Sequence, residues 1–319
     1  MANRVFVSAV VILWLCSMTW LISDRILPSF LPGEPPPASG IQINKPISWR
    51  VSWAGNEVGR ASTVRVRGIA GTSELHNRIL LNDVPLMEFA PAWMRLALGR
   101  VGNITIDSST RIEFDSLGNF SAFDSRVALN DLPSVLRITG RLEDSYLQLR
   151  VSSGALTHST PVFMPNSKML NESLFPVARI PYLREGRTWR EEVYSPFRTP
   201  GNPIELIQAE VMGLESMEYN GEPHRVFRVE YRDITGTGVA REARLQSVSW
   251  IEPKGEVLRR DVYMGSSQLR FERLSEDESL EVGGELFERI LPRGPDGELP
   301  SAVSSTKEVP DITFSDNRN

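Results

Sequence analysis

The sequence has little of what metal centres, disulfides and nucleophilic sites are made from. Its 319 residues include one cysteine, Cys16, and three histidines, His76, His158 and His224. Because Cys16 lies inside an apolar run, the remaining chain can form neither a disulfide nor a reactive thiol. No histidine has a second histidine, a cysteine or a paired carboxylate at metal-ligand spacing. We therefore expect no metal site and no thiol chemistry.

Signatures of common enzymes and of nucleic-acid binders are also missing. No G-x-S-x-G elbow occurs, and the glycines at 236 and 238 lack the third glycine of a nucleotide-binding loop. The S-x-x-K match at 304–307 falls in an acidic tail, where no helix is expected to hold the lysine beside the serine. The net charge is −5, without a dense basic face. We therefore expect a protein that is not an enzyme, needs no cofactor and binds no nucleic acid.

One long apolar run is present, at the N-terminus. Residues 5–22 carry no charge, and as a helix they would be about 27 Å long, close to the roughly 30 Å of a bilayer core. Trp20, Leu21 and Ile22 do not provide the small residues that a signal-peptide cleavage site needs. The run predicts an uncleaved signal anchor over residues 1–23, a single transmembrane helix. A removable signal peptide is the alternative.

The charges around this run predict its orientation. Arg4 and the N-terminal amine precede it, whereas beyond it Arg25 is offset by Asp24. Because positive charge is retained on the cytoplasmic side, the N-terminus is predicted to be cytoplasmic and the rest of the chain extracytoplasmic. An exposed part without cysteine pairs fits a bacterial envelope protein. The sequence thus predicts a single-pass protein of the bacterial inner membrane that faces the periplasm.

Beyond the anchor, the chain divides by composition into three parts. Residues 24–45 contain five prolines and predict an extended spacer. Residues 46–274 carry strand patterns and predict an antiparallel β domain, with possible halves at 46–160 and 187–274. The last 46 residues hold 11 acidic and 4 basic side chains, so an acidic, partly disordered tail is predicted over 275–319.

Alternation with a period of two fills the β domain. Trp49, Val51 and Trp53 alternate with polar residues, and Gly55 supplies a turn, which predicts a hairpin with one apolar face. Over residues 245–248 the apolar phase slips by one residue, which predicts a β-bulge. Further strands are predicted at 74–81, 104–114, 120–129, 134–142, 146–152, 188–195, 203–219, 224–232, 239–251, 256–264 and 267–274, with a long loop at 160–186.

Residues 88–98 break the strand pattern. Phe89, Trp93 and Leu96 recur at helical spacing, and Gly99 supplies a stop, so one short amphipathic helix is predicted among the strands. The fold class is therefore mainly β. We expect a curled, open antiparallel sheet, or half-barrel, with one or two helices, preceded by the single N-terminal transmembrane helix.

Three short segments resemble periplasmic domains related to the lipoprotein-carrier superfamily. They are WIEPKGEVLR at 250–259, GNEVG at 55–59 and LREGRTW at 183–189, and the resemblance covers about residues 45–274. It implies an open antiparallel sheet curled around one or two helices, whose apolar concave face holds acyl chains in that superfamily. The anchor and spacer of this chain depart from the carrier members, which are usually soluble and shorter.

Apolar side chains are the candidate binding residues. A curved sheet with a single helix leaves a half-covered apolar face, which favours some of them contacting a ligand. Taken alone, each aromatic residue among them is better explained as part of an ordinary core. The candidates are Trp49, Trp53, Phe89, Trp93, Leu96 and Trp250.

Two classes of function agree with these observations. The first is a membrane-anchored extracytoplasmic β domain that binds a lipid or another apolar ligand in cell-envelope biogenesis. The alternative is a non-catalytic accessory or structural subunit that docks a partner protein in the envelope and holds no ligand. Lipid that co-purifies with the protein would distinguish the first class from the second.

Overall fold

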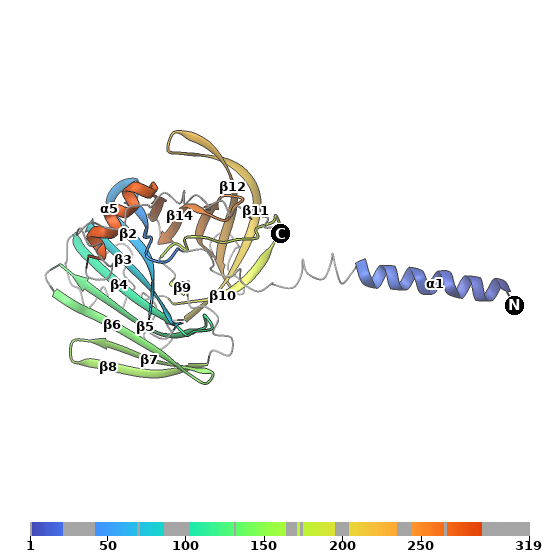
Figure 1. Cartoon of the computed structure of the whole chain (residues 1–319), viewed down its shortest axis with the longest axis horizontal. Coiled ribbons are helices and arrows are strands. Elements are labelled where there is room, and N and C mark those ends of the chain that lie inside the picture. The colour runs from blue at the N-terminus through green and yellow to red at the C-terminus, as the bar shows by residue number, and fades with distance from the viewer. Residues whose placement is uncertain are drawn as a thin grey trace, which may run out of the picture.

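The computed structural model describes residues 2–21, 42–68, 71–85, 103–130, 132–163, 171–172, 175–194, 204–234, 244–264 and 267–288. Within these ranges the chain forms two helices and fifteen strands (Figure 1). The helices are α1 (Ala2–Leu21) and α5 (Glu276–Leu286). The strands are β1 (Ile47–Trp53), β2 (Asn56–Arg67), β3 (Ser73–Val84), β4 (Ile104–Phe114), β5 (Phe120–Leu129), β6 (Leu132–Glu143), β7 (Tyr146–Ser153), β8 (Leu156–Phe163), β9 (Asn171–Glu172), β10 (Thr188–Tyr194), β11 (Ile204–Tyr219), β12 (Glu222–Asp233), β13 (Leu245–Ile251), β14 (Val257–Met264) and β15 (Ser267–Arg273).

These strands form one sheet in the order β8-β7-β6-β5-β4-β3-β2-β1-β15-β14-β13-β12-β11-β10-β9. Neighbours are antiparallel, except that the short β9 pairs with β10 in parallel. Strands β1 to β8 follow one another from the middle of the sheet to one edge. The chain then crosses to the opposite edge, where β9 lies, and β10 to β15 lead back to the middle, where β15 pairs with β1. Among the described strands the two edges do not pair with each other. The prediction of a mainly β protein with an open antiparallel sheet is therefore confirmed.

Helix α1 covers most of the apolar run that predicts a signal anchor. Within the described ranges, no helix is both long and apolar enough to cross a membrane. Ile22 and residues 24–41 of the predicted spacer lie outside those ranges. The transmembrane anchor and the extracytoplasmic location therefore stay predictions.

The two halves of the sheet curl around one shared apolar core (Figure 1). Successive side chains of a strand point to opposite faces. On β1, Trp49, Val51 and Trp53 are buried on the face toward this core, here called the inner face. Side chains of β2–β4 and of β10–β15 meet there. The predicted halves 46–160 and 187–274 thus share this core, and β4–β7 hold a second buried apolar cluster around Phe123.

Residues 175–183, here called the strap, contribute to the same core. Ala178 and Ile180 are buried in it, and backbone hydrogen bonds attach them to the turn between β13 and β14. The Ile180 N–H donates to the Gly255 oxygen at 2.7 Å, and the Val257 N–H donates to the Ala178 oxygen at 3.2 Å. A Cβ on Gly255 would lie 2.8 Å from the Ile180 oxygen, and the φ angle there is +95°. Both facts explain why this turn of the 250–259 segment needs glycine.

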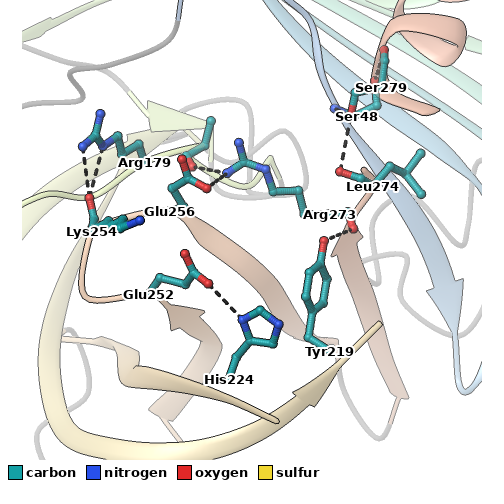
Figure 2. Close-up of polar contacts among 11 residues, drawn as sticks. Ser48, Arg179, Tyr219, His224, Glu252, Lys254, Glu256, Arg273, Leu274 and Ser279 are labelled. Carbon is teal, nitrogen blue, oxygen red and sulfur yellow. Dashed lines mark hydrogen bonds and ion pairs between the residues drawn. The ribbon is translucent and has the colours of Figure 1, made fainter. Parts of the chain in front are cut away.

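Side chains add polar contacts around the strap (Figure 2). Arg179 donates to the Lys254 oxygen at 3.1 and 3.3 Å, and Arg273 donates to the Ala178 oxygen at 3.3 Å. Tyr219, at the tip of the β11–β12 hairpin, donates its hydroxyl to the Arg273 oxygen at 2.7 Å. The strap, the hairpin tip and the end of β15 are therefore held together.

Helix α5 begins with a capping box. The Ser275 side chain accepts from the Glu278 N–H, and the Glu278 side chain accepts from the Ser275 N–H, which satisfies two backbone donors at the helix start. The acidic first turn lies at the positive end of the helix dipole. From the sequence, this segment was expected to belong to the acidic tail, and no helix was predicted there.

Small residues let α5 lie close to the outer face of β1 and β2. The Ser48 N–H donates to Ser279 Oγ at 3.2 Å, and the Ser48 hydroxyl donates to the Ser279 oxygen at 3.1 Å (Figure 2). Ser48 Oγ also lies 2.8 Å from Ser62 Oγ. A Cβ on Gly283 would lie 2.3 Å from Pro46 Cβ. The helix is therefore packed directly against the start of β1.

Three predicted segments have different outcomes. The loop predicted at 160–186 is wrong at its start, because β8 runs as far as Phe163 and pairs with β7. The helix predicted at 88–98 lies outside the described residues. The strand predicted at 120–129 coincides with β5.

Candidate functional site on the outer face

A groove of about 660 Å³ lies on the outer face of the sheet, beside the C-terminal end of α5. Side chains of β3, β4 and β5 form its floor, and residues 285–288 form one wall. Most of the lining residues are polar or charged. The groove therefore differs in chemistry from the apolar inner face.

The strand register places Ser109 at the centre of the floor. It pairs with Arg78 on β3 and with Arg126 on β5. Neighbouring strands lie about 4.8 Å apart, so arginine positions flank Ser109 on both sides. Arg111 follows two residues later on β4 and therefore points to the same face. An exposed serine thus lies among three arginines.

Arg78 connects the floor to the wall. Its guanidinium donates to both Asp107 carboxylate oxygens, at 3.0 and 2.7 Å, and to the Leu286 oxygen of α5 at 2.8 Å. The hydrogen bonds to Asp107 raise the pKa of Arg78 above its ordinary value and outweigh the opposing effect of burial. Because the Leu286 carbonyl lies at the negative end of the helix dipole, the cation also stabilises the helix end.

Asp124 is shared between two arginines. Arg137 donates to both of its oxygens, at 3.1 and 2.8 Å, and Arg126 donates to one of them at 2.9 Å. Burial opposes ionisation of Asp124, but the hydrogen bonds from Arg137 and Arg126 outweigh it and lower the pKa of the carboxyl group. The carboxylate side chain is 18% exposed, whereas those of Arg126 and Arg137 are 53% and 50% exposed. One carboxylate is therefore shared by two half-exposed guanidinium groups.

His76 lies beside Arg111 in the neighbouring cross-strand row. Its Nε2 is 2.9 Å from Glu74 Oε2. Burial lowers the pKa of His76 below its ordinary value of 6.5, although Glu74 acts in the opposite direction. The charge of Arg111 lowers this pKa further. His76 is therefore held neutral near pH 7.

Buried side chains below the surface keep the groove in place. Phe287 packs on Val64 and fixes the wall to β2. On the inner face, Thr63 donates to Asn77, and Thr110 donates to Ser125 at 2.9 Å. These bonds connect the strands that carry the floor. A fixed arrangement of donors favours binding, because less side-chain freedom is lost when a ligand arrives.

The groove has hydrogen-bond donors but no recognised set of metal ligands. In the described part of the chain, no cluster of three or more histidine, cysteine or acidic residues could hold a metal ion. The arginines and Ser109 can donate hydrogen bonds to an anion. What this arrangement does chemically is to present guanidinium donors at a fixed spacing, beside the carboxylates of Asp107, Asp124, Glu285 and Glu288.

The structure separates the candidate binding residues predicted from the sequence. Trp49 and Trp53 lie buried in the shared core on the inner face. Trp250 lies on the opposite face, because its neighbour Ile251 belongs to the core. Its indole N–H donates to Glu215 at 2.5 Å, and the Arg259 guanidinium lies 4.4 Å from its ring centre.

One ligand could therefore contact Trp250 together with Trp49 and Trp53 only if it reached both faces of the sheet. The other three candidates, Phe89, Trp93 and Leu96, lie outside the described residues.

A second histidine–carboxylate pair lies near the tip of the β11–β12 hairpin, far in sequence from the groove residues. His224 Nδ1 is 3.0 Å from Glu252 Oε1, and the His224 ring packs edge to face on Tyr219 (Figure 2). The sequence alone shows no carboxylate partner for this histidine, because Glu252 lies on another strand connection. The pair joins the β11–β12 hairpin to the β13–β14 turn.

The sequence pattern alone does not identify the residues of the groove. Arg78, Ser109 and Arg126 occupy polar positions of three amphipathic strands, and such positions usually face solvent without a function. The available signal is the polar face of β4, which includes Ser109 and Arg111. Only the pairing register shows that these side chains lie together.

Comparison with known proteins adds a likeness of fold. No protein-family model matches the chain, and no curated protein matches it. The solved structures that resemble it include a beta-barrel-like protein of the domain of unknown function DUF1849 from Brucella abortus. The identity is 9%, the match covers 72% of this chain and 95% of that chain, and the TM-score is 0.44. Likeness at this level carries no argument about ligand or activity. These comparisons do not identify the lipoprotein-carrier superfamily.

Proposed function

We propose that this protein is a membrane-tethered, extracytoplasmic β domain that binds a partner or ligand without transforming it, as an accessory component of the bacterial cell envelope. Its working surface is the groove on the outer face. The observation that carries the proposal is the contrast between the two faces. The inner face of the described strands is filled by buried side chains and by the strap, whereas the outer face has an open groove of about 660 Å³.

The side chains of the groove support binding. The paired carboxylates Asp107 and Asp124 hold arginines in place on the floor, and the wall is fixed to the floor by Arg78. Such ion pairs contribute little to stability when they are exposed. Their use here is to fix the positions of half-exposed donors that face the groove.

The membrane tether in this proposal rests on the apolar run at residues 5–22. An intact N-terminal sequence on the mature protein, read by mass spectrometry of membrane fractions, is the expected result. A mature chain that begins between residues 24 and 39 would instead identify a removable signal peptide.

Site-specific photo-crosslinking tests the groove as the working surface. A benzophenone amino acid is placed at Ser109 of the full-length chain in native membranes, with Arg190 as the matched control. Arg190 is an exposed residue of β10. Adducts that form from Ser109 and not from Arg190 support the proposal. Equal adduct yields from both positions contradict it, as does the absence of adducts from Ser109.

A second candidate function is the binding of a lipid on the inner face. One polar cluster in the apolar core favours it. Arg260 is buried there, 5.1 Å from the Tyr231 ring centre, and donates to Ser247 at 3.2 Å. Glu191 and Tyr231 also act electrostatically on Arg260, and a polar cluster of this kind inside an apolar core matches a ligand with a polar head and an apolar body. Such a ligand would have to displace the strap.

Lipid extraction distinguishes the two functions. The full-length protein is purified in a detergent unrelated to bacterial lipids, and organic extracts are analysed by mass spectrometry. One lipid species in about equimolar amount, lost in an Arg260→Met variant that still folds, favours the inner face. An extract that contains only bulk membrane lipids, equal for both proteins, leaves the groove as the better account.

A further inference from the structure

The far end of the β11–β12 hairpin leaves the sheet. From Phe227 to Arg232, β12 pairs with β11 on one side and with β13 on the other. Residues 215–226, here called the arm, pair only with each other among the described strands and extend as a two-stranded ribbon (Figure 1). At the base of the arm, Glu215 accepts from the Trp250 indole N–H at 2.5 Å. Because a two-stranded hairpin is only marginally stable alone, the position of the arm depends on what it contacts.

A β-bulge lies where the arm begins. Val211 pairs with Val229, but Gly213 pairs with Arg228, so Met212 is an extra residue on β11. The φ angle of Gly213 is +144°, a value that glycine adopts more easily than residues with a side chain. Bulges bend the strand that carries them. The hairpin therefore has a bend directly before the arm, in the place where a hinge is needed.

The arm has a contact side and a solvent side. Successive side chains of a strand point to opposite faces, and the hairpin register places Tyr219, His224 and Val226 on one side. Tyr219 and His224 are half-buried there, and Val226 is fully buried. Glu218 and Arg225, on the other side, are exposed. The arm therefore lies with one side against the rest of the molecule.

Two polar contacts hold the contact side in place (Figure 2). The Tyr219 hydroxyl donates to the Arg273 oxygen at 2.7 Å, and His224 Nδ1 lies 3.0 Å from Glu252 Oε1. The two rings of the arm pack edge to face, with their centres 5.4 Å apart. The arm is thus attached at two points, the end of β15 and the β13–β14 turn.

The same two points hold the strap. Arg273 donates to the Ala178 oxygen at 3.3 Å. In the β13–β14 turn, the Gly255 N–H donates to the Glu252 oxygen at 2.7 Å, and the Gly255 oxygen accepts from the Ile180 N–H at 2.7 Å. A displacement of either attachment point therefore acts on the arm and on the strap together.

The strap is less firmly attached than a strand of the sheet. Two backbone hydrogen bonds, from the Ile180 N–H and from the Val257 N–H, connect it to the β13–β14 turn, whereas a strand has a whole ladder. Its buried side chains, Phe175, Ala178 and Ile180, belong to the inner-face core. A segment with few hydrogen bonds opens at a lower free energy than the strands around it. Displacement of the strap would uncover apolar surface of that core.

We propose that the arm is a hinged latch that keeps the strap closed over the inner face. When the arm turns at Gly213, Tyr219 and His224 leave their partners. The end of β15 and the β13–β14 turn then lose this support, and the strap parts from the core. The opening gives an apolar ligand access to the inner face. This control is separate from binding in the outer groove and does not depend on it.

The variant Tyr219→Phe/His224→Phe tests the latch. Its phenyl rings can still pack on each other but can form neither polar contact. The matched control is Glu218→Gln/Arg225→Gln, on the solvent side of the same arm. Amide hydrogen exchange of the full-length protein in mild detergent is followed by mass spectrometry, with peptides from the strap, from the β13–β14 turn and, as an internal reference, from β3.

We expect the amides of Ile180 and Val257 to exchange about tenfold faster or more in the latch variant, while those of β3 do not change. The control should exchange like the wild type. Spin labels on Asn220→Cys and Lys254→Cys, in a Cys16→Ser background, measure the position of the arm directly. Both labelled positions are exposed. The latch variant should show an additional population at a longer distance between the labels.

Three results would overturn the inference. Unchanged exchange at Ile180 and Val257 would mean that the strap does not depend on the arm. Equal acceleration in β3 would mean that the variant lowers the stability of the whole sheet and that the contacts are ordinary stabilising ones. A longer distance between the labels without faster exchange of the strap would show an arm that moves and controls nothing.

Discussion

The variant Gly283→Ala tests how α5 is packed and, with it, how the groove is built. A Cβ at Gly283 would lie 2.3 Å from Pro46 Cβ and 2.5 Å from Pro46 Cγ. In a helix interior, alanine in place of glycine ordinarily stabilises by about 1 kcal/mol. Overpacking against a rigid neighbour costs about 1–3 kcal/mol. Because the proline ring cannot rotate away, we expect the cost to win and the variant to lose up to about 2 kcal/mol of unfolding free energy.

Repeating Gly283→Ala in a Pro46→Gly protein separates the effect of the clash from the difference in helix propensity between glycine and alanine. It removes both proline atoms that the new Cβ would meet, so Gly283→Ala should there stabilise the protein by about 1 kcal/mol. Glu281→Ala, at an exposed position of the same helix, should change stability by less than about 0.5 kcal/mol. Unfolding in urea is followed by tryptophan fluorescence of the full-length protein in mild detergent.

The sign of the effect decides the outcome. If Gly283→Ala stabilises the protein in both backgrounds, the helix does not lie against Pro46 and the packing argument is wrong. If the packing is as described, the clash also displaces the end of α5. The bond from Arg78 to the Leu286 oxygen would then lengthen, and the groove wall would lose its attachment.

Three further changes test other parts of the structure. Gly255→Ala should destabilise by about 1–3 kcal/mol, because it combines a positive φ angle with overlap of the Ile180 oxygen; an unchanged urea midpoint would show that the strap is not attached there. Burial lowers the pKa of His76, so below about pH 6.5 the unfolded chain binds the proton more readily and stability falls as the pH falls. His76→Gln should remove this loss between pH 7.5 and 5.5, and equal slopes for both proteins would contradict it. Trp49→Ala should cost about 3–5 kcal/mol as a core residue, whereas Trp250→Ala on the outer face should cost less than about 2 kcal/mol; similar costs would mean that the two faces are assigned wrongly.

The strands could be predicted because their signals are local. Strand β5 has the predicted bounds, since alternating side chains and the turn before it identify it without knowledge of its partners. The predicted bulge is confirmed as well, because Tyr231 pairs with Ser247 while Arg232 pairs with Leu245, which skips Gln246. A slip of the apolar phase is visible within a single segment.

Helix α5 and strand β8 could not be predicted, because their signals are not local. Two glycines and an acidic first turn give α5 little amphipathic pattern, and its partner Ser48 is 231 residues away. Strand β8 is an edge strand with mostly exposed side chains, among them threonine, serine, histidine and proline. Such a composition is typical of a loop. Pro161 within it is typical of an edge, where a missing N–H costs no ladder hydrogen bond.

The position of the groove follows from the length of α5. The helix contacts β1 and β2 and ends at Leu286, and the side chain of the next residue, Phe287, packs on Val64 of β2. The outer face of β3–β5 therefore continues beyond the helix without its cover, and the step between them forms the groove. The negative end of the helix dipole points at this step and is met by Arg78, which donates to the Leu286 oxygen. Arg78 is thus occupied by the helix end, and Arg111 and Arg126 are left to face the groove.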